Sequence, residues 1–131
     1  MLRIHETFIS NPTGQGLAMV LGLLSVALGG CVGATYVPIS AAAYPARSKD
    51  CPIEVFTTAL PDRAYEELGI AEGEGSLWKS DTEDVLPKLK EEACRAGGDA
   101  IVWLSDGKFS QGEDNYPVLR SVVTVIRWRN R

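Results

Sequence analysis

The chain has 131 residues, about the length of one domain, of which 45% are hydrophobic and 23% charged. This composition is typical of a folded protein and excludes a disordered tail or a collagen-like fibre. Thirteen Lys and Arg oppose seventeen Asp and Glu, so the net charge is −4 and the isoelectric point is near 5.0. An acidic chain without a basic arm is not expected to bind nucleic acid.

The apolar residues are concentrated near the amino terminus, where positions 16–34 contain no charge. Residues 17–28 form an apolar run of twelve, which is the length of the hydrophobic region of a secretory signal peptide. The motif Leu28-Gly29-Gly30-Cys31 follows, with an aliphatic residue three positions before the cysteine and two small residues directly before it. We therefore interpret residues 1–30 as a signal peptide.

This motif resembles the lipobox of bacterial lipoproteins. The resemblance implies that the Cys31 thiol receives a diacylglyceryl group, that cleavage falls between Gly30 and Cys31, and that the new amino terminus is acylated as well. Two or more acyl chains anchor a protein stably in a membrane. By resemblance to enterobacterial sorting rules, Val32 in place of Asp permits transfer to the outer membrane, where the domain would face the periplasm.

Two alternatives remain open for the same stretch. Residues 17–34 would be just long enough to remain in the membrane as one helix. They would otherwise form a buried helix of the folded domain, although glycines at 16, 22, 29 and 30 weaken a soluble helix. The lipobox favours the signal peptide over both.

Residues 31–50 are interpreted as the lipid anchor and a flexible tether. The segment VGATYVPISAAAYPARSKD at 32–50 is rich in Ala, Pro and Ser and lacks helical or strand periodicity. A flexible coil of this length would reach roughly 25 Å. The tether would hold the folded domain clear of the headgroups.

The folded domain is expected at residues 51–131. Strands are predicted at 53–58, 65–71, 100–104 and 118–128, because these runs are rich in β-branched and aromatic residues. Residues 106–115, DGKFSQGEDN, are predicted to form a polar loop. The resulting order β-β-α-β-β predicts an α+β fold, in which one helix packs on one face of a small antiparallel sheet.

The helix in this order is predicted from a capping box and an apolar stripe. Ser80 and Glu83 have the capping-box spacing, and Leu86, Leu89, Ala93 and Ala96 follow at spacings of three and four. If the helix starts at Ser80, Pro87 lies beyond its first turn, where proline removes a backbone hydrogen bond and kinks the axis. The helix therefore either begins near Asp84 or bends at Pro87. Gly97-Gly98 is expected to end it.

The passage LKEEACRAGGDAIV at 89–102 is similar to the helix, glycine turn and strand of two related groups. These are the stress-sensor lipoprotein of the Rcs system and the small YbjQ-type domains. The first group implies envelope stress sensing, and the second implies a small-ligand or metal-binding domain that forms ring oligomers. The Rcs-type domain has two disulfides, so at most one of them can carry over to the cysteines of this chain.

The chain has three cysteines, an odd number until one is lipidated. Removing Cys31 from the count leaves Cys51 and Cys94, which we expect to be bonded in an oxidising compartment. The alternative is two free thiols, with Cys94 buried and Cys51 exposed.

Catalytic and cofactor signals are sparse, so we predict no catalytic, cofactor-binding or metal site. The single histidine, His5, lies in the predicted signal peptide, which removes imidazole triads and metal sites from the mature protein. Solvated surface charge is expected for three carboxylate pairs, Glu66-Glu67, Glu91-Glu92 and Glu72 with Glu74. Helix capping is expected for Asp81, Glu83 and Asp84. Trp103 is expected in the core, whereas Trp78 in a glycine-rich loop and Trp128 near the chain end could line a ligand surface. A small basic end is formed by Arg127, Arg129 and Arg131.

The sequence therefore predicts a non-enzymatic binding or sensing module that is held in the bacterial envelope by Cys31 and contacts another envelope protein through its sheet. Two alternatives stay open. One is a structural protein that is associated with the envelope or cell wall. The other is a ligand-binding or metal-binding oligomer of the YbjQ type.

Overall fold

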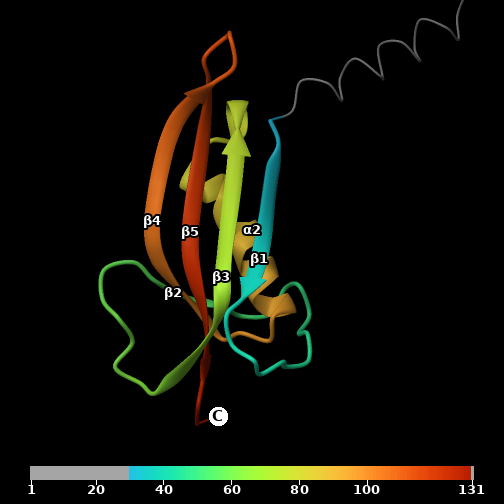
Figure 1. Ribbon diagram of the computed structural model, residues 1–131, viewed down its shortest axis with the longest axis vertical. Coiled ribbons are helices and arrows are strands. Elements are labelled where there is room, and N and C mark those ends of the chain that lie inside the picture. Colours follow the sequence, from blue (N-terminus) through green and yellow to red (C-terminus); the bar gives the residue numbers. More distant parts are fainter. Residues whose placement is uncertain (1–29, 131) are drawn as a thin grey trace, which may run out of the picture.

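A computed structural model describes residues 30–130 of the chain. Residues 1–29 and 131 lie outside this part, and with them the predicted hydrophobic run, His5 and Arg131. Five strands form one sheet, and one α-helix packs on one of its faces (Figure 1). The elements are β1 (Val32–Pro38), β2 (Glu54–Phe56), β3 (Tyr65–Ser76), the 3₁₀ turn η1 (Leu77–Lys79), α2 (Thr82–Arg95), β4 (Ala100–Gln111) and β5 (Tyr116–Trp128).

The strand order in the sheet is β1-β3-β5-β4-β2. The pairs β1 with β3, β3 with β5, and β4 with β5 are antiparallel, whereas β2 pairs parallel to β4. The expected α+β class with one helix is confirmed, but the expectation of a purely antiparallel sheet is wrong. The alternation of side chains identifies a strand without giving the direction of its neighbour, and β2 is only three residues long.

The expected tether at 32–50 is instead part of the domain. Seven of its residues form β1, whose register with β3 runs from Val32 opposite Gly75 to Pro38 opposite Gly69. The alternative of a membrane helix over residues 17–34 is also wrong for residues 32–34, because these belong to β1. The sequence of this strand gives little β signal, because its inward residues are only half-buried and it contains small residues such as Gly33 and Ala34.

The segment between β1 and β2 is held by backbone hydrogen bonds. The N–H groups of Ile39 and Ser40 both donate to the Leu68 carbonyl, at 3.0 and 3.1 Å. The Arg47 N–H donates to the Cys94 carbonyl at 2.9 Å. These bonds fix the segment to β3 at one end and to α2 at the other.

Helix α2 begins one residue later than the predicted cap would place it. Asp81 is the N-cap residue, and its N–H donates to the Asp84 carboxylate at 3.4 Å. The helix continues through Pro87. It ends in a Schellman motif, in which Gly97 adopts φ 78° and the Gly98 N–H donates to the Ala93 carbonyl at 2.8 Å.

Two glycines of β3 let the helix lie close to the sheet. A Cβ atom built on Gly73 would collide with the Val85 side chain and come within 3.0 Å of Leu89. One built on Gly75 would collide with the Lys79 carbonyl. The predicted strand ends at residue 71, but both glycines lie within β3 and are buried.

The core lies mainly between α2 and the sheet. Val85, Leu89 and Ala93 of the helix are fully buried against inward residues of the sheet such as Val123 and Val125. A smaller cluster lies on the opposite face of the sheet. It consists of Ala100, Val102, Ile126 and Trp128, with Phe56 and Tyr65 packed against it.

Strand β4 is longer than predicted, because it includes residues 106–111 of the expected loop. Every residue from Leu104 to Gln111 is exposed, so this half of the strand carries no apolar alternation. Pairing with β5 defines it as a strand, and the turn that remains is Gly112 to Asn115.

The expected disulfide is confirmed. Cys51 and Cys94 are bonded with their Cα atoms 5.9 Å apart, across a sequence separation of 43. Cys94 is fully buried on α2, and Cys51 lies in the segment that leads into β2. By the chain-entropy model, a disulfide that closes a loop of this length raises the free energy of unfolding by at most about 4 kcal/mol, because it restricts the unfolded chain.

The close approach of α2 to β3 can be tested with Gly73→Ala. The added methyl group meets Val85 and Leu89, and such overpacking should lower the free energy of unfolding by about 1–3 kcal/mol. Gly33→Ala is the matched control in β1, because nothing lies within 4 Å of its added Cβ. Urea unfolding followed by circular dichroism measures both. Equal unfolding midpoints for the two variants would contradict the packing.

Candidate functional site

Cys31 lies at the start of the sheet, one residue before β1. It is exposed, and it is the free cysteine of the described residues. Its backbone carbonyl accepts hydrogen bonds from the Ser76 N–H at 3.0 Å and the Ser76 hydroxyl at 3.5 Å. Gly30 packs directly against the Ser76 carbonyl and the Lys79 side chain. The predicted lipidation position is therefore accessible and fixed against the end of β3.

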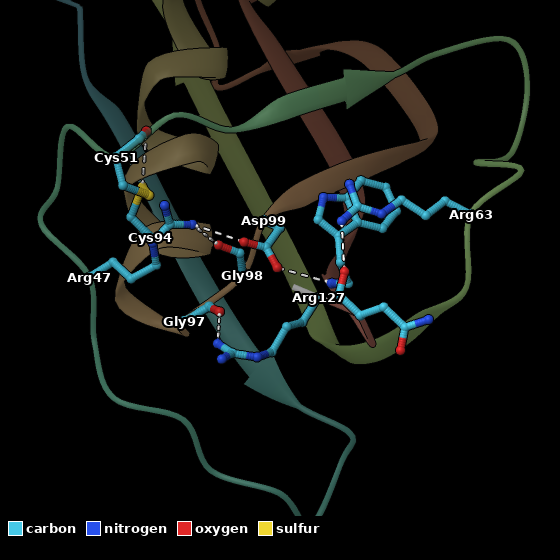
Figure 2. A network of polar contacts seen from close by, with 10 residues as sticks. Arg47, Cys51, Arg63, Cys94, Gly97, Gly98, Asp99 and Arg127 are labelled. Atoms are coloured by element: carbon cyan, nitrogen blue, oxygen red, sulfur yellow. Dashed lines mark hydrogen bonds and ion pairs between the residues drawn. A yellow bond between two sulfur atoms is a disulfide. The ribbon is translucent and has the colours of Figure 1, made fainter.

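A polar network surrounds Asp99 at the opposite end of the helix (Figure 2). Its carboxylate accepts from the Arg47 guanidinium at 3.2 Å and from the Trp128 backbone N–H at 3.0 Å. Arg47 also donates to the Gly98 carbonyl at 2.7 Å, and Arg127 donates to the Gly97 carbonyl at 2.8 Å. Each of these bonds satisfies a backbone group or an ion at the turn between α2 and β4, so the network supports the fold.

An open cleft of about 590 Å³ lies beside this network, at the carboxyl end of β5. Its lining residues include Tyr44, Glu66, Arg127 and Arg129. The Arg127 guanidinium stacks over the Tyr44 ring at 4.0 Å from its centroid, and Arg129 donates to the Tyr65 carbonyl at 3.0 Å. The predicted basic end therefore borders a cleft, although both arginines already hold partners.

Glu66 carries the one carboxylate among the residues lining this cleft. It accepts hydrogen bonds from the Tyr44 hydroxyl at 2.6 Å and from the Ser40 hydroxyl at 3.0 Å. These two bonds, the Tyr44 bond above all, lower the pKa of Glu66 below its ordinary value of 4.5. The bond to Glu66 also raises the pKa of Tyr44. Glu66 is therefore held as a carboxylate, which is the form that accepts both bonds.

The paired carboxylates of the sequence do not converge on a common point. Glu66 and Glu67 are consecutive on β3, so their side chains leave opposite faces of the sheet. The other two pairs are occupied by ion pairs. Arg120 holds Glu72 and Glu74, each at 3.0 Å, while Arg95 holds Glu92 at 2.6 Å and Glu91 at 3.4 Å.

The three tryptophans occupy different surroundings. Trp78 in η1 is 76% exposed. Trp128 is buried in the smaller cluster, with the Arg63 guanidinium 4.6 Å from its ring centroid. Trp103, which was expected in the core, is only partly buried at its margin, where its indole N–H donates to Asp106 at 2.7 Å.

One edge and one face of the sheet are open around β1. Among residues 30–130 this strand ends the sheet, with β3 as its one neighbour. Val37 of β1 and Ile70 of β3 face each other across the ladder on the side away from α2, and they are 61% and 37% exposed. An unpaired edge next to exposed apolar residues can accept an extended segment of another protein.

Sequence reasoning missed the group formed by Tyr44, Ser40 and Glu66. Two of its members lie in the segment that the sequence predicts to be a tether, and Glu66 is predicted to be solvated surface charge. Tyr44 precedes Pro45 in a segment without strand periodicity, and nothing in that pattern indicates that its hydroxyl bonds to Glu66. The apposition depends on β1 turning back beside β3, which places Ser40 next to Leu68.

Within residues 30–130 no group of three His, Cys, Asp or Glu residues is arranged to hold a metal ion. No helix in this part of the chain has the length and apolar character needed to cross a membrane. The features described here that can take part in function are thus the exposed Cys31, the open sheet edge and the arginine-lined cleft.

No known protein family matches the chain, and no curated protein matches its sequence. Among solved structures, the chain is similar to the Francisella virulence factor FvfA in an orthorhombic crystal form. The two share 14% sequence identity with a TM-score of 0.47, over 71% of this chain and 97% of that chain.

The hydrogen bond between Tyr44 and Glu66 can be tested with Tyr44→Phe. Loss of the phenol hydroxyl should raise the pKa of Glu66 toward 4.5, as measured by NMR titration of its side-chain carboxyl carbon. Because the folded pKa is lowered, the Glu66 contribution to stability is present above the unfolded pKa and is lost as pH falls through the folded pKa. Tyr44→Phe should therefore destabilise the protein more at neutral pH than in acid.

Tyr36→Phe is the matched control, since it removes a phenol hydroxyl from β1 and leaves both bonds to Glu66 in place. It should leave the Glu66 titration unchanged. An unaltered Glu66 pKa in Tyr44→Phe would show that the phenol does not stabilise the carboxylate.

Proposed function

We propose that this protein is a lipoprotein of the bacterial envelope, anchored through acylated Cys31 and acting as a non-enzymatic binding module. The observation that carries the proposal is how the three cysteines divide. Cys51 and Cys94 form a disulfide, and Cys31 alone is free and exposed. Disulfides persist in oxidising compartments, which agrees with export. The unpaired cysteine is also the one that ends the lipobox.

The surroundings of Cys31 are suited to acylation. The thiol lies outside the core, at the boundary between the part of the chain that we expect to be removed and the first strand. Val32 to Pro38 already pair with β3, so cleavage before Cys31 costs the sheet none of its residues. The new amino terminus would lie beside Ser76 at the end of β3.

The binding role is assigned to the open side of β1. Its outer edge pairs with no other strand of the part of the chain that the structure describes, and Val37 and Ile70 present apolar surface on the face away from α2. Main-chain hydrogen bonds to an edge strand supply affinity, and neighbouring side chains supply specificity. The ion-paired carboxylates offer no matching acid and base for catalysis, which favours a partner over a substrate.

Acylation can be tested by intact-mass analysis of the protein purified from a bacterium that processes lipoproteins. We expect a chain that begins at Cys31 and carries diacylglyceryl and fatty-acyl additions. Cys31→Ser should give an uncleaved, unacylated precursor that no longer purifies with the membrane fraction. A wild-type chain that retains Met1 and has no acyl adduct would contradict the proposal.

Partner binding can be tested by placing a photoreactive residue at position 37 of the full chain in cells. Val37 is 61% exposed beside the free edge, so we expect a discrete crosslink to an envelope protein. Position 83 on the first turn of α2, also exposed, is the matched control and should give none. Crosslinking to peptidoglycan would favour a structural role, and crosslinking to the same chain would favour an oligomer.

A further inference from the structure

Two apolar side chains are held in solvent at the end of the sheet where Cys31 lies. Leu77 and Trp78 follow β3 in the turn η1, and they are 38% and 76% exposed. Leu77 adopts φ 59°, a left-handed conformation that is strained for a branched side chain. None of the three residues of η1 is buried. The fold therefore keeps a strained turn that contributes nothing to the core.

This turn lies against the predicted anchor. The Ser76 N–H, directly before the turn, donates to the Cys31 carbonyl at 3.0 Å. Gly30 contacts Lys79, directly after Trp78: a Cβ atom built on Gly30 would lie 3.0 Å from both the Lys79 backbone nitrogen and its side chain. The predicted cleavage removes Gly30, so in the mature chain the bond from Ser76 to the Cys31 carbonyl is the contact that keeps the turn beside the anchor.

The anchor has little freedom to move away from this turn. Cys31 is followed directly by β1, and one residue of extended chain spans only about 3.5 Å. Acyl chains on Cys31 would therefore hold η1 at the depth of the headgroups. Figure 1 shows the start of β1 and the end of β3 side by side, which agrees with the pairing of Val32 with Gly75.

The residue types of the turn suit that position. Tryptophan is enriched where a membrane meets water, because its ring is apolar and its N–H is polar. Lysine places its ammonium at the interface while its stem lies along apolar groups. Glu113 and Asp114, in the β4–β5 turn at the same end of the sheet, favour an orientation that keeps this hairpin away from anionic headgroups.

We infer that the Leu77–Lys79 turn is a membrane-contact site, in which Trp78 inserts into the interfacial region of the bilayer beside the acylated Cys31. The inference rests on the proposed lipidation. It adds a second point of contact and thereby an orientation: the corner formed by the start of β1 and the end of β3 faces the lipid, while Val37 near the other end of β1 and the cleft lie away from it.

The test uses the full chain, produced in a bacterium that processes lipoproteins and reconstituted into phosphatidylcholine and phosphatidylglycerol vesicles. Some of the phospholipids carry bromine on the acyl chain, either near the headgroup or near the terminal methyl. Bromine quenches tryptophan fluorescence on contact. We expect quenching that is stronger for bromine near the headgroup. Trp78→Phe should remove most of it.

Trp103→Phe is the matched control, since Trp103 is partly buried in the domain and should be out of reach of the lipid. In that variant the quenched fraction of the remaining fluorescence should rise. Both substitutions keep an aromatic ring, and Trp78 has few packing contacts to lose.

The two possible failures are distinguishable. An intact mass without acyl groups would overturn the anchor, and the membrane contact with it. An acylated chain whose quenching is unchanged by Trp78→Phe would leave the anchor in place and overturn only the contact.

Discussion

The close packing of α2 on the glycine-containing half of β3 is the constraint on which the rest of the domain depends. Within residues 30–130 one helix, α2, covers the inner face of the five-stranded sheet, and it can do so only if its apolar stripe reaches the backbone of the sheet. Gly73 and Gly75 leave the space that Val85 fills. The helix then covers one face and leaves part of the other open, so the same packing accounts for the core and for the exposed surface beside β1.

The two ends of the sheet are stabilised by different kinds of contact. At one end the Cys51–Cys94 disulfide and the Asp99 network fix the helix C-terminus to the surrounding chain. At the other end Cys31 and Ser76 join the first strand to the end of the third. The first set combines a covalent bond with part-buried hydrogen bonds, whereas the second lies at an exposed cysteine.

The class of the fold, the helix and four of the strands could be predicted from periodicity, capping and turn residues. The disulfide could be predicted because the lipobox sets Cys31 apart and leaves two cysteines in a chain expected to be exported. Strand β1 could not, because an edge strand of small and half-buried residues resembles a linker. The outer half of β4 could not either, since an exposed ladder has no apolar alternation. The contact of Tyr44 with Glu66 depends on that hidden strand, and a sequence gives no sign of such long-range partners.

The direct junction of Cys31 and β1 has a mechanical consequence. Strand β1 runs antiparallel to β3 and β3 antiparallel to β5, so β1 and β5 point the same way along the sheet. The chain enters at one end of the molecule and leaves at the other (Figure 1). Tension applied between Cys31 and the carboxyl terminus would therefore act along the strands and at right angles to the hydrogen bonds that join them. The ladders share this load in shear, and they do not open one bond at a time.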